Sequence, residues 1–226
     1  MNRFWNFISE GEARTLRLDR PISDETWWGD EITPAIFREE LLAGAGDITV
    51  WINSPGGDVF AAAQIYTMLK EYPGRVTVKI DGFAASAASV IAMAGSEVLM
   101  SPVSYMVIHN PATIAIGDSA EMLRAKAMLD EIKEGIINAY QAKTKLSRER
   151  ISCLMDEDSC FNARSAVELG FADGILYEEQ LKADIAPVIF SRMAVTNSLL
   201  DKMPKNIKPG WATYDELLAD LYTLKH

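Results

Sequence analysis

The sequence predicts an α/β fold built as a single domain. Short β-branched stretches alternate with longer stretches whose apolar residues recur at helical spacing, and turn-forming residues separate the two kinds. A chain of 226 residues that is 49% hydrophobic and 24% charged is long enough for one sizeable core and too apolar for disorder. This alternation implies right-handed crossovers between the strands.

A strand, a helix and another strand are expected within residues 47–81. Residues 47–53 are β-branched and stop at Ser54-Pro55-Gly56-Gly57, which predicts a strand followed by a turn. Asp58 stands where an N-cap belongs, and the helical pattern after it continues until Pro73-Gly74. Residues 75–81 then predict a second strand of the same type.

Six further helices and strands are expected before the pattern changes. Residues 82–95 predict a tight turn and a helix of small residues, and residues 97–100 and 105–109 predict two short strands. One long helix is expected from Asp118 to Thr144; it either projects from the domain to serve assembly or packs on the sheet. Capping residues predict two more helices, from Ser147 through Leu154 and from Asn162 to Gly170.

The C-terminal part of the chain departs from this alternation. Beyond about Pro187, prolines and a glycine interrupt any periodicity, and helical spacing returns only at residues 214–224. We therefore expect residues 1–186 to form the domain and residues 187–226 to form an extension rather than a second domain.

Composition excludes several classes of partner. With 22 Lys and Arg against 32 Asp and Glu, the net charge is −10, which disfavours nucleic acid and anionic membranes as partners. No run is long and apolar enough for a membrane span, and the N-terminus lacks the apolar core of a signal peptide. Cys153 and Cys160 have no ligand cluster around them, so we expect reduced structural cysteines, no metal site and a cytoplasmic location.

Three segments hold residues suited to chemistry, although each also has a structural interpretation. His109 is the only histidine besides the terminal His226, so histidine-dependent proton transfer falls to it unless it is structural. Gly56-Gly57 either leaves N–H donors for an anion at a helix start or forms a plain turn. The small residues around Ser86 either admit a substrate carbonyl or simply pack closely.

A serine and a histidine that work together need a carboxylate to orient the imidazole. The candidates are later acids that lie near turns, and spacing alone does not choose among Asp156, Glu157, Asp158 and Asp173.

Four motifs in this order resemble the Clp protease proteolytic subunit (ClpP) family, over roughly residues 14–178. They are Asn53-Ser-Pro-Gly-Gly57, Ala84-Ala-Ser86, Val107-Ile-His109-Asn-Pro111 and Phe161-Asn-Ala-Arg-Ser-Ala-Val-Glu-Leu-Gly170-Phe-Ala-Asp173. The resemblance implies a ClpP/crotonase-like spiral of repeated β-β-α units, with the helix at residues 118–144 as a projecting handle. It also implies rings of identical subunits, commonly heptameric.

The same resemblance implies a role for each site residue. Ser86 is the nucleophile, His109 the base and Asp158 the acid, while the amides of Gly57 and Ala87 are the oxyanion donors; Asp173 is left as a structural acid. These roles imply hydrolysis of peptide bonds through an acyl-enzyme, with polypeptide as substrate and without metal or organic cofactor.

Some details are similar to the phage and prophage ClpP-like proteases of head maturation. The similarity lies in the stretch Gly56-Gly-Asp-Val-Phe-Ala-Ala-Ala-Gln-Ile-Tyr66. In addition, little sequence precedes the first strand, and about fifty residues follow Ile175. These features favour an ATP-independent peptidase that cleaves capsid or scaffold protein, and they argue against an AAA+ unfoldase partner.

Three alternatives stay open at this point. The chain can be a housekeeping degradative subunit fed by an AAA+ unfoldase, or a catalytically silent capsid-assembly protein. A crotonase-type enzyme would share the fold and the oxyanion donors, but it would make the combination of Ser86 and His109 a coincidence.

Overall fold

The computed structural model describes residues 3–10, 13–22, 34–177 and 190–191. The chain divides into two compact units, Met1–Arg192 and Met193–His226, and every described residue belongs to the first. The boundary predicted at residue 186 lies outside the described residues. Residues 190–191, which fall in the predicted extension, form a short strand of the first unit.

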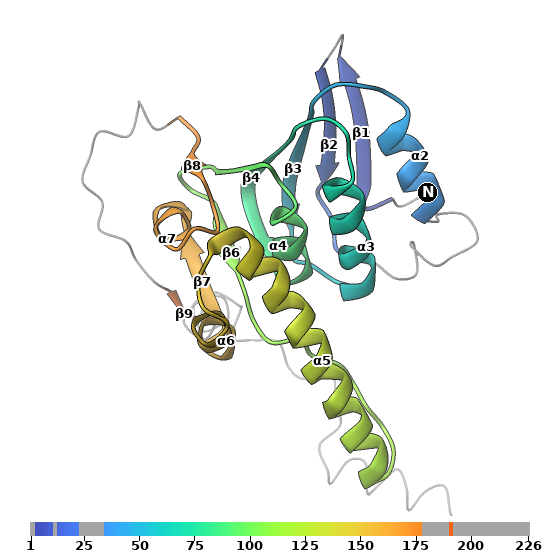
Figure 1. Ribbon diagram of the computed structural model, residues 1–226, viewed down its shortest axis with the longest axis vertical. Helices are drawn as coiled ribbons and strands as arrows, with labels where there is room; N and C mark the ends of the chain where they lie inside the picture. Colours follow the sequence, from blue (N-terminus) through green and yellow to red (C-terminus); the bar gives the residue numbers. More distant parts are fainter. Residues whose placement is uncertain (1–2, 11–12, 23–33, 178–189, 192–226) are drawn as a thin grey trace, which may run out of the picture. The chain divides into compact units, whose positions relative to one another are not determined.

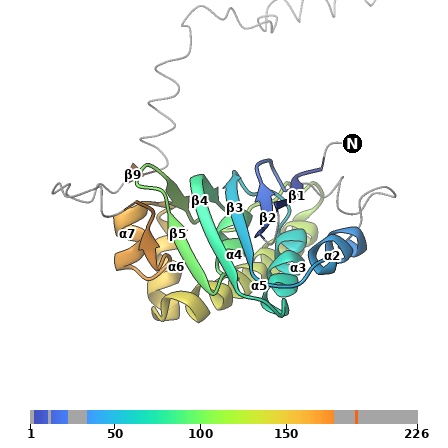
Figure 2. The ribbon, with the colours of Figure 1, turned by 90° about the horizontal axis from the view of Figure 1, so that it is seen from above.

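The first unit is a sheet with helices on one face (Figures 1 and 2). Its strands are β1 (Trp5–Glu10), β2 (Ala13–Leu18), β3 (Ile48–Ser54), β4 (Val76–Ala85), β5 (Glu97–Met100), β6 (Tyr105–Val107), β7 (Ser159–Asn162), β8 (Gly174–Ile175) and β9 (Phe190–Ser191). Its helices are α2 (Pro34–Leu42), α3 (Val59–Lys70), α4 (Ala87–Ala92), α5 (Ser119–Thr144), α6 (Arg148–Asp156) and α7 (Ala163–Glu168). The mixed α/β class predicted from the sequence is confirmed.

The order of strands in the sheet is β1-β2-β3-β4-β6-β7-β9; off this path, β5 pairs with β4 and β8 pairs with β5. Strands β2, β3, β4 and β5 are parallel, whereas β1 forms an antiparallel hairpin with β2, and β7 is antiparallel to β6. The expected strand at residues 47–53 and the helix after Asp58 are both present, and the Asp58 side chain accepts a hydrogen bond from Ala61 N at 2.5 Å.

Strand β4 continues further than the sequence indicates, and this corrects the turn and helix expected at residues 82–95. Its first half pairs with β5, but Phe83–Ala85 pair with Tyr105–Val107 of β6, so the strand belongs to two parts of the sheet. Small residues from Gly82 onward looked helical by composition, and pairing with a strand distant in sequence decides their conformation instead. Only Ala87–Ala92 form the helix.

The hydrophobic core lies between the sheet and the helices. In β3 the residues Ile48, Val50 and Ile52 are fully buried and alternate with half-buried residues on the other face. Helix α3 covers them with Ala61, Ala62 and Ile65. Burying each of the large side chains contributes about 1.5–3 kcal/mol, and this alternation fixes the register of the strand.

The long helix α5 is packed at one end and exposed at the other. Ile136, Ile137, Ala139 and Tyr140 near its C-terminus are buried, whereas Leu123 near its N-terminus is 68% exposed. Figure 1 shows the N-terminal part extending away from the sheet. The helix therefore packs on the domain through its C-terminal half and projects through its N-terminal half, and a role in assembly stays a prediction. No helix among the described residues is long and apolar enough to cross a membrane.

Candidate active site

Ser86 lies in a tight turn between strand β4 and helix α4. Its backbone has φ 55° and ψ −127°, an unfavourable conformation for a residue with a Cβ, and its N–H donates to Val107 O at 2.9 Å. Such backbone strain costs on the order of 1–3 kcal/mol and collects at functional sites. A strained serine between a strand and a helix is also the geometry that exposes a nucleophilic hydroxyl.

The Gly56-Gly57 loop is held by the segment that follows β2. Ile22 N donates to Gly56 O, and Asp58 N donates to Ile22 O, both at 2.8 Å. These two bonds flank Gly57, whose own N–H has no acceptor among the described residues, and the same is true of Ala87 N–H at the start of α4. Unpaired backbone donors at helix starts suit an oxyanion.

The loop packs against the Ser86 turn so closely that a side chain at Gly56 has no room. A Cβ there would lie 2.6 Å from Ala85 O and 2.8 Å from Ser86 Cβ, and φ is +91°. Gly46 has nearly the same φ, +92°, but a Cβ would meet nothing within 4 Å. Comparing alanine substitutions at Gly56 and Gly46 therefore separates the energetic cost of a positive φ from the cost of steric crowding.

We therefore expect Gly56→Ala to lower the free energy of unfolding by more than Gly46→Ala does. Both variants incur the left-handed backbone penalty of about 1–2 kcal/mol, and only Gly56→Ala adds overpacking of about 1–3 kcal/mol. Urea denaturation of the two variants at equal protein concentration measures the difference. Equal losses would contradict the close packing of the loop on the Ser86 turn.

One pocket of about 540 Å³ collects four of the five predicted site residues. Gly57, Ser86, Ala87 and His109 all line it, although they come from three separate segments of the chain. Apolar residues of α5 form much of the remaining wall: Met128, Leu129, Ile132 and Ile136. Asp158 is not among the lining residues.

His109 follows strand β6, and its imidazole is held by the chain's own backbone. Nδ1 lies 2.6 Å from Asn110 O, so in the Nδ1–H tautomer the ring donates to that carbonyl and leaves Nε2 as a proton acceptor. Within the described part of the chain, the Ser86 hydroxyl makes no hydrogen bond to this ring. Catalytic hydrogen bonds are often long before substrate binds.

Asp158 directly precedes β7, and His109 comes shortly after β6, the antiparallel partner of that strand. Val107 pairs with Cys160, and Ile108 N donates to Ser159 O at 3.0 Å, so this register continued by one residue would place His109 and Asp158 across from each other. Asp158 has φ 49°, a left-handed conformation that aspartate tolerates better than most residues.

Two of the other candidate acids, Asp156 and Asp173, form hydrogen bonds and ion pairs away from the His109 ring. Asp156 Oδ1 accepts from Lys133 Nζ at 2.7 Å and from Asn110 Nδ2 at 2.9 Å, and the Lys133 bond, more than the Asn110 bond, holds its pKa below the usual value. Asp173 accepts from Val98 N at 2.6 Å and pairs with Lys143, which ties β5 to α5. These contacts suit structural acids.

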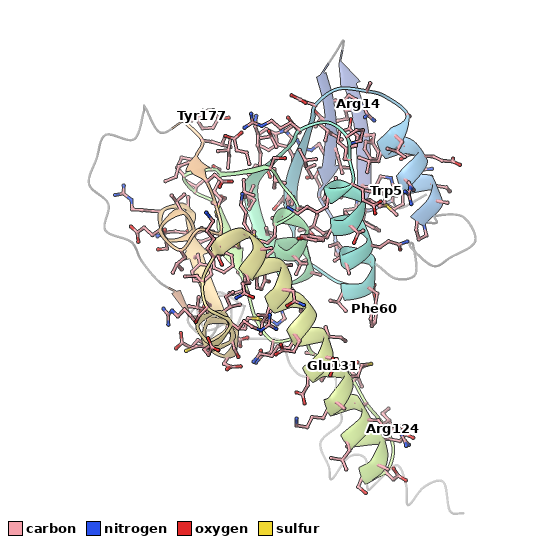
Figure 3. The ribbon with its side chains drawn as sticks, in the orientation of Figure 1. Trp5, Arg14, Phe60, Arg124, Glu131 and Tyr177 are labelled. Carbon is pink, nitrogen blue, oxygen red and sulfur yellow. The ribbon has the colours of Figure 1, made fainter. Side chains whose placement is uncertain are left out.

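A second hollow of about 550 Å³ continues the pocket between α3 and α5. It shares Val59, Phe60 and Met128 with the first, and its walls are almost entirely apolar. Figure 3 shows Phe60 at the end of α3 nearer to α5 and Glu131 near the middle of α5. A bound chain would meet an apolar wall here beside the polar atoms of the Ser86 turn.

The sequence does not predict two features of the site. The Asn110 carbonyl that holds His109 has no sequence signal, because every residue carries such a group. The apolar stripe of α5 is visible in the sequence, but only the fold places it on the pocket. No three His, Cys, Asp or Glu side chains of the described residues gather closely enough to hold a metal ion.

A family model, curated sequence relatives and a solved structure all place this chain in the same family. The Clp protease family model matches residues 11–179. The ATP-dependent Clp protease proteolytic subunit 1 of Chlamydia muridarum is 30% identical over 172 residues, which cover 74% of this chain and 88% of that protein. The proteolytic subunit 2 of Thermobifida fusca is 34% identical over 154 residues, 65% of this chain and 75% of that protein.

A solved structure agrees with the sequence relatives. A point mutant of ClpP1 from Listeria monocytogenes superposes with a TM-score of 0.62 at 26% identity, covering 72% of this chain and 90% of that one. The fold, the family match and the sequence relatives agree: the chain belongs to the Clp protease family and is a serine endopeptidase of the ClpP type.

Proposed function

We propose that Ser86, His109 and Asp158 form the catalytic triad of this peptidase. His109 Nε2 takes the proton of Ser86 as Oγ attacks the peptide carbonyl, and Asp158 holds the imidazole and stabilises the imidazolium. The N–H groups of Gly57 and Ala87 then bind the oxyanion, each contributing roughly 3–4 kcal/mol. The observation that carries this proposal is the single pocket lined by Ser86, His109 and two unpaired N–H donors.

For Asp158 to hydrogen-bond to His109, the imidazole must change its hydrogen-bond partner. The ring donates to Asn110 O in the single chain, and it exchanges that acceptor for the Asp158 carboxylate when the site becomes competent. The register of β6 and β7, continued by one residue, would bring Asp158 across from His109, which supports this exchange.

Assembly into a homo-oligomeric ring, heptameric as the resemblance implies, is part of the same proposal. Large apolar side chains lie exposed on α5 and on the segment before it: Ile114 is 91% exposed and Ile116 92%. Exposed apolar groups in this number favour contact with further subunits. We assign peptidase function to residues 1–186 and leave residues 187–226 outside the site.

For the biological role we propose ATP-independent processing of phage capsid or scaffold protein in the cytoplasm of a bacterial host. The similarity of residues 56–66 to head-maturation proteases supports this role. The chain also continues for 47 residues beyond position 179, where the match to the family model ends.

A degradative subunit working with an AAA+ unfoldase is the second candidate. The names of the relatives favour it, because they are ATP-dependent Clp protease subunits. A catalytically silent assembly protein has less support, since Ser86, His109 and Asp158 are all present.

Cleavage of one unfolded polypeptide separates the two candidates. We expect the purified protein, without nucleotide or partner, to convert an unfolded model polypeptide into a few fragments with defined ends, because a processing enzyme selects its sites. Mass spectrometry of the products measures this. Cleavage that occurs only with an added ATPase, or proceeds to short random peptides, would support the degradative role instead.

A further inference from the structure

A buried serine and a buried tyrosine meet behind the Ser86 turn. Ser89, in helix α4, has no exposed surface, and its Oγ lies 2.5 Å from the carbonyl oxygen of Ser86 and 2.8 Å from the hydroxyl of Tyr140. The Ser89 N–H donates to the same carbonyl at 2.9 Å. Tyr140 comes from the packed end of α5, where only 1% of it is exposed.

Chemistry fixes the direction of these hydrogen bonds. A carbonyl oxygen only accepts, so the single proton of Ser89 Oγ goes to Ser86 O, and Tyr140 must then donate to Ser89 Oγ. Burial raises the pKa of Tyr140 well above its usual value, which keeps the phenol protonated as a donor. The ring is held in place by an edge-on contact with Phe171, 5.4 Å between centroids.

The Ser86 carbonyl, which accepts the last hydrogen bond from Tyr140 through Ser89, belongs to the same peptide group as the Ala87 N–H, the proposed oxyanion donor. In a planar trans peptide the C=O of Ser86 and the N–H of Ala87 point in opposite directions, so two donors on the carbonyl fix the direction of the N–H. Hydrogen bonds in series also polarise one another, which makes that N–H a stronger donor.

We propose that Ser89 and Tyr140 are positioning residues, which aim and polarise the Ala87 N–H at the oxyanion. This inference rests on the proposed function, since it requires Ser86 as nucleophile and Ala87 as oxyanion donor. It extends that function to two side chains that do not touch the reacting atoms. It also connects the oxyanion donor to α5, the helix that lines the pocket.

The chain contains a matched control for this arrangement. Ser104 is also fully buried, its Oγ donates to Ser101 O at 2.8 Å and its N–H to the same carbonyl at 3.0 Å. The local bonding is the same as at Ser89, but it lies in the turn between β5 and β6 and involves no residue of the pocket. Ser104→Ala therefore reports the structural cost of losing such a bond.

The test uses two ester substrates that differ only in the attacked group, a carbonyl C=O in one and a thiocarbonyl C=S in the other. Sulfur accepts N–H hydrogen bonds weakly, so only the oxygen substrate benefits fully from the oxyanion donors. We expect Ser89→Ala to lower kcat/KM about tenfold for the oxygen ester and to change the sulfur ester little, since complete loss of a donor costs roughly 10²–10³-fold. The ratio of kcat/KM for the oxygen ester to kcat/KM for the sulfur ester therefore falls.

Tyr140→Phe keeps the ring and removes only the hydroxyl, so it provides the answer if Ser89→Ala does not fold. We expect the same direction with a smaller fall in the ratio. Ser104→Ala should leave the ratio unchanged. A wild-type ratio retained in Ser89→Ala and Tyr140→Phe, or an equal loss on both substrates, overturns the positioning role. A wild-type protein that turns over neither ester, or does not prefer oxygen, contradicts the proposed function itself.

Discussion

Ser86→Ala is expected to lower kcat for peptide hydrolysis by at least roughly 10⁴-fold, because losing the nucleophile disables the triad as a unit. The hydroxyl contributes chemistry and little packing, since Ser86 makes no side-chain cap bond to helix α4. Alanine and serine both carry a Cβ, so the strained backbone at φ 55° costs nearly the same in each. Initial rates on a fluorogenic peptide, normalised to total protein concentration, measure the loss.

The same samples must show that the fold and the assembly are unchanged. Sedimentation and thermal unfolding of Ser86→Ala should match the wild type, while Ser104→Ala, which loses a buried hydrogen bond outside the pocket, should be less stable and yet active. Retained turnover in Ser86→Ala would remove this residue from its role, whatever the stability data show.

Asp158→Asn is expected to lower kcat roughly 10³–10⁴-fold, comparable to the loss of the acid in other serine triads. Asparagine keeps the size of the side chain and tolerates the left-handed backbone at φ 49°, so the turn before β7 should persist. The amide cannot stabilise the imidazolium and favours the wrong tautomer of His109. Steady-state kinetics at several pH values separate this effect from a change in KM.

Asp156→Asn is the matched control, because it changes a carboxylate two residues away with the same chemistry. Asp156 pairs with Lys133 and Asn110 and is half exposed, so its loss should change kcat little. A larger loss of kcat in Asp156→Asn than in Asp158→Asn would transfer the acid role to Asp156.

Local sequence patterns predicted the elements that depend on local interactions. Asp58, Ser147 and Asn162 are the N-caps predicted from the sequence, and each accepts a backbone N–H at the start of its helix. The β1–β2 hairpin and helix α2 were missed, since their pattern is weak and their pairing with β3 and the core is long-range. The same reason explains the longer β4, whose end is fixed by β6.

The site could be predicted only in part. Ser86, His109 and Gly57 are candidates from the sequence itself, and the family resemblance adds Ala87 and assigns their roles. Their meeting in one pocket depends on strand order that no local pattern contains. The Asn110 carbonyl on His109 and the Tyr140–Ser89 pair behind Ser86 depend on backbone direction and on a helix far along the chain. Such contacts follow from the fold alone.

Covalent labelling of the native protein with a fluorophosphonate is the decisive test of Ser86 as the nucleophile activated by His109. The reagent reacts with a serine that a neighbouring base has activated, and intact-mass spectrometry followed by peptide mapping identifies the residue. We predict one adduct per chain, on Ser86, and none in His109→Ala. An adduct on another serine, or undiminished labelling of Ser86 in His109→Ala, would contradict it.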